Sequence, residues 1–394
     1  MKKFLITVIG ITALIGIILA LVSYISGKKK NEDDETQLVE YVTVNMTTEA
    51  TEEATTEEVY VPLDDTSFST ATDPDYLIDS IEAGNTDTYV PQQKTEDTDR
   101  PIFLINSKGA NVKKGSTFDI HSLIGYGDDV DRDVDLKVDG EVDTSTVGTY
   151  NLTLTLTDDA GHTNTSPFTV RVVEGGGGGD DGTVRQGTES FKEFMETYKQ
   201  DGTQVGLDVS RWQGTIDFNK VKEAGCDFVI IRLGGYDDGE HYTDKCYAEN
   251  IKNAKAAGLK VGIYWHAEES STDEAEMSVA YLMNILGGEQ LDFPIAYDWE
   301  DFIGFEKYKM NLQDINDCFE AFATAVEAKG YEACLYSSKN FLESVWVNGR
   351  NHKIWLAHYT NQTDYRGNYY MWQHTSSGKI DGISTAVDFN ILYE

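Results

Sequence analysis

Basic residues are scarce in this sequence. Of its 394 residues, 32 are Lys or Arg and 68 are Asp or Glu, so the formal net charge is −36 at pH 7. Binding to a nucleic-acid backbone requires a basic surface, and none is apparent here. We therefore predict no nucleic-acid partner. A neutral glycan is compatible with this composition, because aromatic faces and hydrogen bonds bind sugars.

Cysteine is also rare. The four cysteines, Cys226, Cys246, Cys318 and Cys334, all lie in the C-terminal half of the chain. An exported protein could pair them as disulfides, or they could be small buried thiols, and the sequence leaves both alternatives open. Neither a CxxC motif nor the Cys and His spacing of a zinc site occurs. We therefore predict no metal and no cofactor.

Long apolar runs are absent except at the start of the chain. An uncharged apolar run extends from Phe4 to about Ser26 and has lysines on both flanks. A run of roughly 20 apolar residues is enough to cross a bilayer as a helix. We predict that residues 1–30 form a single transmembrane signal-anchor and that the rest of the chain is exported. The alternative is a cleaved signal peptide, which would release a secreted protein.

Large apolar residues are few between residues 31 and 99, which are rich in Thr, Glu and Asp. This composition cannot bury enough apolar surface to offset the entropy of ordering, so it predicts a disordered acidic spacer. Five consecutive glycines at residues 175–179 predict a second flexible segment, a linker over 175–203 that includes a short helix from Glu189 to about Tyr198. A linker of this kind predicts loose coupling between the domains on its two sides.

Residues 100–174 contain short runs in which apolar and polar residues alternate. Residues 151–157 alternate strictly, and Phe168, Val170 and Val172 repeat the pattern. Alternation of period two is typical of half-buried strands, so we predict a small all-β sandwich.

An acidic run lies within this β-rich segment. It comprises Asp128, Asp129, Asp131, Asp133 and Asp135. Carboxylates at this spacing could hold Ca²⁺. Acidic loops are more often simply solvated, and we predict that this one is solvated and holds no metal.

Residues 204–394 alternate apolar runs with amphipathic segments. The runs suited to buried parallel strands are Val205–Asp208, Phe228–Arg232, Val261–Trp265 and Pro294–Trp299. Ser271–Glu274 fits a capping box that begins a helix, and Gly287 can end that helix. Repeated strand and helix units predict an α/β barrel or a doubly wound sheet, and periodicity alone does not distinguish the two.

Acidic residues appear where these apolar runs end. Asp298 and Glu300 are two residues apart, so both project from the same side of a strand end, which is where barrel active sites lie. Two carboxyl groups on one side repel each other and raise one pKa. A protonated carboxyl beside an ionised one is the pair that cleaves glycosidic bonds. Asp208 and Asp388 end or follow other apolar runs and suggest a site for sugar rather than for phosphate.

Aromatic residues accompany the acids, as a groove for sugar rings requires, although about half of them are expected in the core. They are Trp212, Tyr264, Trp265, Tyr297, Trp299, Trp355, Tyr359 and Trp372.

Ordered motifs give these residues a family resemblance. The segment Asp208-x-Ser210-x-Trp212-Gln213-Gly214 resembles the opening signature of glycoside hydrolase family 25 lysozymes. Further matches are the Asp298-x-Glu300 pair, Ile354–Tyr359, Trp372-Gln373, Ser376–Ile383 and Val387-Asp388-x-Asn390. The segment Val147–Tyr150 and the strand and turn that follow it are similar to bacterial immunoglobulin-like surface modules.

The resemblance implies a flattened (β/α) barrel that hydrolyses the β-1,4 bond between N-acetylmuramic acid and N-acetylglucosamine in peptidoglycan. It implies that Glu300 is the general acid/base and that Asp298 holds the N-acetyl group of the substrate. It also implies that Asp208 and Asp388 line the site and tune this pair. The residues predicted to bind substrate are Tyr264, Trp299, Trp372, Gln373, Tyr359 and Trp212.

The position of Asp298 and Glu300 on one side of a strand bears on the stereochemistry, and the apolar segment at residues 1–30 bears on the location. We predict retention of configuration with assistance by the 2-acetamido group of the substrate, and the alternative is inversion by an activated water. Alternative functions are an N-acetylglucosaminidase or chitinase-like hydrolase and a non-catalytic wall-binding protein. We expect the protein in the bacterial cell membrane, with its catalytic domain in or near the wall.

Overall fold

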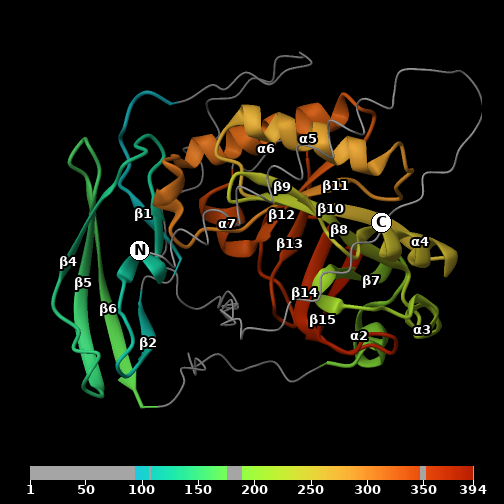
Figure 1. The fold of residues 1–394 in the computed structure, drawn as a ribbon, viewed down its shortest axis with the longest axis horizontal. Coiled ribbons are helices and arrows are strands. Elements are labelled where there is room, and N and C mark those ends of the chain that lie inside the picture. Colours follow the sequence, from blue (N-terminus) through green and yellow to red (C-terminus); the bar gives the residue numbers. More distant parts are fainter. Residues whose placement is uncertain (1–93, 106–107, 175–188, 347–351, 394) are drawn as a thin grey trace, which may run out of the picture. The chain divides into compact units, whose positions relative to one another are not determined.

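The computed structural model describes residues 94–105, 108–174, 189–346 and 352–393 (Figure 1). The predicted membrane helix, most of the predicted spacer and the five glycines lie outside these residues. Among the helices described, none is long and apolar enough to cross a membrane.

The first described domain is all-β, as the alternating pattern predicted. Its strands are β1 (Ile102–Ile105), β2 (Gly109–Lys113), β3 (Gly125–Gly127), β4 (Asp135–Asp139), β5 (Gly148–Thr157) and β6 (Thr163–Val173). One sheet has the order β2-β6-β5-β4, and β1 pairs with β3 in a second. Alternate residues of β5, among them Leu152 and Leu154, are buried against Phe168 and Val170 of β6.

The second domain is built on one large sheet. Its strands are β7 (Thr203–Val209), β8 (Phe228–Asp237), β9 (Glu240–Thr243), β10 (Lys260–Ala267), β11 (Ile295–Trp299), β12 (Ala333–Ser338), β13 (Lys353–Ala357), β14 (Met371–Gly378) and β15 (Val387–Tyr393). The order is β10-β11-β12-β13-β14-β15-β7-β8-β9, and β10 also pairs with β8. That last pairing closes eight strands into a barrel-like sheet, which decides between the two folds that periodicity left open.

Helices cover the outside of this sheet (Figure 1). They are α2 (Phe191–Tyr198), α3 (Phe218–Glu223), α4 (Tyr247–Ala256), α5 (Thr272–Leu286), α6 (Leu312–Glu327) and α7 (Lys339–Ser344). The predicted ends of α5 are confirmed. The Ser271 hydroxyl accepts a hydrogen bond from the Glu274 backbone N–H, and Gly287 ends the helix in the left-handed conformation, with φ of 60°.

Helix α2 belongs with the barrel rather than with the linker to which the sequence assigned it. Phe191 and Phe194 are buried in the barrel core, and the ring of Phe191 meets Phe389 edge-on at 5.1 Å between centroids. The backbone N–H of Phe191 also donates to the carbonyl of Lys379 at 2.8 Å. All four cysteines are free, so the disulfide alternative does not hold in this structure.

The sandwich is packed directly on the barrel, and the expectation of loose coupling is wrong. Ile102 and Leu104 of β1 are part of the barrel core cluster. The guanidinium of Arg132 donates to both carboxylate oxygens of Asp314 at 2.6 and 2.8 Å. A glycine linker determines the behaviour only of the segment that it spans. The contacts with the barrel are made by β1 and by Arg132, which lie elsewhere in the sandwich.

Candidate active site

Three strands bring the four predicted acids together. Asp298 is in β11, and Glu300 follows that strand directly. Asp208 of β7 and Asp388 of β15 are direct partners in an antiparallel pair. The charges of Asp208, Asp298 and Glu300 all act on Asp388, which shows that the four carboxyl groups share one site.

Glu300 has the pKa expected of a general acid near neutral pH. The residue is exposed at the surface, yet neighbouring protein atoms displace water from its carboxyl. This burial and, second, the charge of Asp208 raise its pKa to about 7. This exposure gives a substrate access to the proton.

The other three acids are held in different environments. Burial, followed by the charge of Glu300, raises the pKa of Asp298 well above its usual range, and Arg232 opposes this rise. Burial and then the charge of Asp208 raise the pKa of Asp388. Burial also raises the pKa of Asp208, but hydrogen bonds from Gln373 and Asn390 favour its ionised form.

A hydrogen-bond network orients the Asp208 carboxylate. Its Oδ2 accepts from the side-chain amides of Gln373 at 2.9 Å and Asn390 at 2.7 Å. The hydroxyls of Tyr336 and Tyr359 donate to Gln373 Oε1 at 2.8 and 2.9 Å. Each tyrosine fixes the amide so that its N–H₂ faces the acid. Gln373 is buried and therefore acts as a positioning residue.

The same arrangement recurs on the other amide. The indole N–H of Trp355 donates to Asn390 Oδ1 at 2.8 Å, which turns the Asn390 amide nitrogen toward Asp208. Tyr336 was not predicted as a site residue. Its strand lies beside β11, with Tyr336 in register with Asp298, a relation that requires the strand order and cannot be obtained from spacing along the chain.

One buried cation faces the acids and was also not predicted as a site residue. Arg232 of β8 lies opposite Tyr264 of β10 in the sheet. Its Nε donates to Asp244 Oδ2 at 3.1 Å, and both side chains are buried. Its positive charge lowers the pKa of Asp298. The sequence contains one sign of this role: Arg232 is a charged residue at the end of the otherwise apolar run Phe228–Arg232.

Tyr264 and His266 lie on the β10 side of the site. Burial raises the pKa of Tyr264 well above its usual range, and the charges of Asp208, Asp298 and Asp388 act on it. His266 is in register with Asp298. Burial lowers the pKa of His266 to about 4, so its ring is neutral at neutral pH. A neutral imidazole can accept or donate one hydrogen bond there.

The predicted aromatic residues differ in their access to a substrate. Trp212 is 59% exposed, and the guanidinium of Arg211 lies 4.9 Å from its ring centroid. This ring is available for stacking. Tyr359 is partly buried and holds Gln373.

Trp299 and Trp372 are corrections to the predicted substrate-binding set. Trp299 is fully buried, packs edge-on against Phe302 at 4.9 Å and donates to the Glu269 carbonyl. Trp372 is buried and donates to the His358 carbonyl at 2.8 Å. Neither ring can stack on a sugar without unpacking the core.

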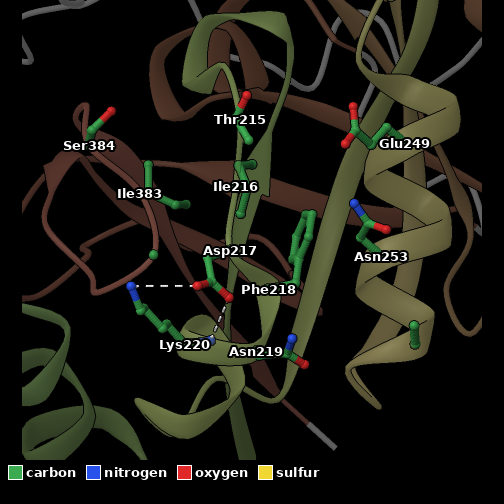
Figure 2. Close-up of a pocket in the computed structure, with 12 residues that line it drawn as sticks. Thr215, Ile216, Asp217, Phe218, Asn219, Lys220, Glu249, Asn253, Ile383 and Ser384 are labelled. Carbon is green, nitrogen blue, oxygen red and sulfur yellow. Dashed lines mark hydrogen bonds and ion pairs between the residues drawn. The ribbon is translucent and has the colours of Figure 1, made fainter.

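A pocket of about 670 Å³ lies elsewhere on the barrel (Figure 2). It is lined by Thr215–Lys220, by Glu249, Asn253 and Ala256 of α4, and by Gly382–Ser384. Figure 2 shows Asp217 and Lys220 turned toward each other, with 3.5 Å between Lys220 Nζ and Asp217 Oδ2. None of the four acids lines this pocket. The candidate active site is assigned to the four acids because their carboxyl groups can transfer protons, and the pocket lacks such a group of acids.

The site offers proton transfer and charge stabilisation. Within the described ranges, two groups have side-chain atoms close enough to share a metal ion, Asp97 with Asp158 and His162, and Asp97 with Asp128 and Asp129. Neither group includes an acid of this site. A barrel that holds one carboxyl with a pKa near 7 and three more acids beside it has the arrangement that the glycoside hydrolase class uses.

Comparison with known proteins assigns the family within that class. Residues 207–383 match the family model described as glycosyl hydrolases family 25. Residues 103–172 match the bacterial surface protein Ig-like domain. Residues 207–383 therefore correspond to a family 25 glycosyl hydrolase domain, and residues 103–172, which precede them, correspond to a bacterial Ig-like domain.

Several relatives align with the barrel domain. The autolytic lysozyme of Clostridium acetobutylicum is 31% identical over 192 residues, which are 48% of this chain and 56% of that protein. Lysozyme M1 of Streptomyces globisporus is 27% identical over 199 residues, 47% of this chain and 66% of that protein. A solved family 25 glycosyl hydrolase from Bacillus anthracis is 18% identical, with a TM-score of 0.43, and covers 48% of this chain and 89% of its own. The chain thus spans little more than half of the Clostridium protein.

Proposed function

We propose that this protein is an N-acetylmuramidase, which hydrolyses the β-1,4 bond between N-acetylmuramic acid and N-acetylglucosamine in peptidoglycan. The observation that carries this proposal is the convergence of Glu300, Asp298, Asp208 and Asp388 in one site at the ends of three strands. Burial raises the pKa of Glu300 to about 7, which leaves this carboxyl partly protonated at neutral pH. The names of two relatives, autolytic lysozyme and lysozyme M1, support the choice of substrate.

In this proposal Glu300 donates its proton to the bridging oxygen as the glycosidic bond breaks. The same carboxylate then removes a proton from the attacking water, so the group returns to its starting state. Asp298 is two residues away on the same side and holds the 2-acetamido group of the substrate against the anomeric carbon. The acetamido oxygen forms the temporary bond that an enzyme carboxylate forms in other retaining hydrolases. Asp208, whose ionised form the hydrogen bonds from Gln373 and Asn390 favour, stabilises the developing positive charge on the sugar, and Asp388 lines the site beside it.

The substitution Glu300→Gln tests the proposed acid. Gln keeps the shape of the side chain and cannot transfer a proton, so the lytic rate of the purified chain should fall by roughly 10²–10⁴-fold. The melting temperature should change little, because Glu300 is exposed at the surface. A variant that lyses cell walls at the wild-type rate would exclude Glu300 as the acid.

Product analysis tests the bond and the stereochemistry. Digested peptidoglycan is reduced with borohydride, hydrolysed and analysed for amino sugars. Muramitol is the expected product, whereas glucosaminitol would identify an N-acetylglucosaminidase. NMR of the anomeric proton early in the digest should show the β anomer, and an α anomer that appears first would favour inversion by water. No release of reducing ends would favour the non-catalytic wall-binding alternative.

We further propose that residues 1–30 anchor the protein in the bacterial cell membrane and that the barrel lies outside, in or near the wall. The uncharged run from Phe4 to about Ser26 supports this location. Fractionation of cells that express the full chain should recover it in membranes with its first residues intact. A shortened protein in the medium would instead indicate signal cleavage.

A further inference from the structure

A second group of carboxyl groups lies at the junction between the sandwich and the barrel. Asp97 precedes β1, and Asp128 and Asp129 follow β3. The side-chain oxygens of these three residues lie within 4.8 Å of one another. Asp128 is 1% and Asp129 is 2% exposed. The prediction of a solvated acidic loop is therefore wrong for these two residues.

Within the described ranges, each of these carboxyl groups has an oxygen that accepts no hydrogen bond. Asp128 Oδ1 accepts from the backbone N–H groups of Val130 at 2.8 Å and Asp131 at 3.0 Å, but Asp128 Oδ2 has no partner in the described part of the chain. Asp129 Oδ1 and both oxygens of Asp97 are also buried without a hydrogen-bond partner there. Native proteins rarely leave buried carboxylate oxygens unpaired, because each one loses its hydration on folding. These unpaired oxygens indicate a bound cation, which would accept their lone pairs.

Among the residues that the structure describes, the cations near the group do not balance its negative charges. Lys94 is the cation that contacts it closely, with Nζ 2.7 Å from Asp129 Oδ2. His162 lies 3.7 Å from Asp97 Oδ1 but is closer to Asp158, at 3.0 Å. Lys94 Nζ also lies 2.8 Å from Asp99 Oδ2, so it neutralises at most one of the three carboxylates. At least two negative charges therefore remain, the number that a divalent cation neutralises.

We propose that Asp97, Asp128 and Asp129 bind a Ca²⁺ ion. The donors are carboxylate oxygens only, which suit a hard cation, whereas zinc prefers nitrogen and sulfur. Mg²⁺ requires a nearly ideal octahedron and keeps most of its water, while Ca²⁺ accepts irregular sets of six to eight oxygens. The three residues come from two separate segments with no regular geometry, and water would complete the coordination.

The position of the site gives the ion a structural role. The carbonyl of Asp128 accepts from the Leu312 N–H at 2.7 Å, and that of Asp129 accepts from Gln313 Nε2 at 2.5 Å. Both donors are in the first turn of α6. An ion bound to the side chains of Asp128 and Asp129 would connect the segment around Asp97 to the loop that packs against the start of α6. Ca²⁺ would thus hold in place the sandwich loop that packs against the first turn of α6.

Calorimetric titration of CaCl₂ into the full chain, purified in detergent and freed of metal, tests the proposal. We expect one Ca²⁺ per chain, with a Kd of about 10⁻⁵–10⁻⁴ M, within the range of protein Ca²⁺ sites. At 1 mM Ca²⁺ the melting temperature should then rise by roughly 3–8 °C. Asp128→Asn and Asp97→Asn should each weaken binding at least tenfold. Glu141→Gln removes an exposed acid from the same domain and should change nothing.

Further arms separate this site from others. Glu300→Gln should bind Ca²⁺ like the wild type, and loss of binding in that variant would move the ion to the active site and overturn the proposal. Wild-type affinity in both Asp variants would overturn it as well, and so would the absence of heat and of any thermal shift in the parent. Mg²⁺ or Zn²⁺ that binds as tightly as Ca²⁺ would overturn the choice of ion. If Asp128→Asn does not fold by circular dichroism, Asp97→Asn, outside the sheets, decides the result.

Discussion

The substitution Asp208→Asn should move the pH dependence of catalysis to lower pH. The pKa of Glu300 is raised from 4.5 to about 7, with burial as the larger cause and the charge of Asp208 as the second. Asn removes that charge and leaves the burial. We therefore expect less than half of the rise in the pKa of Glu300 to disappear, so that this pKa falls from about 7 to about 6.

The sign of the change follows from the role of Glu300. The protonated form is the active acid, so activity falls as the pH rises through the pKa of Glu300. Lowering this pKa therefore shifts the alkaline limb of kcat/KM from near pH 7 to near pH 6. Asn is a suitable replacement, because its carbonyl oxygen can still accept from Gln373 and Asn390, and its amide can donate to Asp388.

The assay is kcat/KM on soluble peptidoglycan between pH 4 and pH 9, with the melting temperature recorded at each pH. The measured quantity is the position of the alkaline limb, because the height of the profile can change for other reasons. Asp201→Asn makes the same chemical change at an exposed residue and should leave the limb in place. A limb that stays near pH 7 in Asp208→Asn, or moves upward, would refute the proposed effect of Asp208 on Glu300.

Three further predictions concern binding and stability. Trp212→Ala should raise KM about fivefold, which corresponds to about 1 kcal/mol of stacking, with an unchanged melting temperature because the ring is largely exposed; an unchanged KM would remove Trp212 from the groove. Trp299→Ala should destabilise the barrel by about 3–5 kcal/mol in denaturant unfolding, as expected for a large buried ring; a loss of substrate affinity at full stability would contradict its place in the core. Gly125→Ala should cost about 1–3 kcal/mol, because its Cβ would lie 1.7 Å from the Phe302 carbonyl oxygen, and limited proteolysis should then cut between sandwich and barrel faster than in the parent.

Strand alternation was enough to predict most of the site from the sequence. The two wrong assignments, Trp299 and Trp372, arose because the same rule was not applied to them. Asp298 and Glu300 were placed on one side of a strand because they are two residues apart. Trp299 lies between them and must point to the opposite side, where the core is. Trp372 precedes Gln373 in β14 in the same way, and since Gln373 faces Asp208, Trp372 faces away.

Other features could not be obtained from spacing. Tyr336 supports Gln373, and Arg232 acts on Asp298, only because strands that are distant in sequence are neighbours in the sheet. The choice between a closed barrel and an open sheet depended on a single pairing, between β10 and β8. The pattern of a strand shows which of its residues are buried, but it does not name the neighbouring strand.

The packing of the sandwich makes it a support of the active site rather than a spacer. The segment that follows Glu300 runs to α6 and meets the sandwich along its length. The Gly304 N–H donates to the Ile124 carbonyl at 3.0 Å, and Gly127 is so close to Phe305 that a Cβ would lie 3.1 Å from the ring. Phe305 in turn packs edge-on against Trp299, the residue between the two acids, at 5.7 Å. Because a packed core transmits small displacements, a shift of the sandwich would reach the strand end that carries Asp298 and Glu300. The position of the proposed acid therefore depends on two domains, although only the barrel supplies its chemistry.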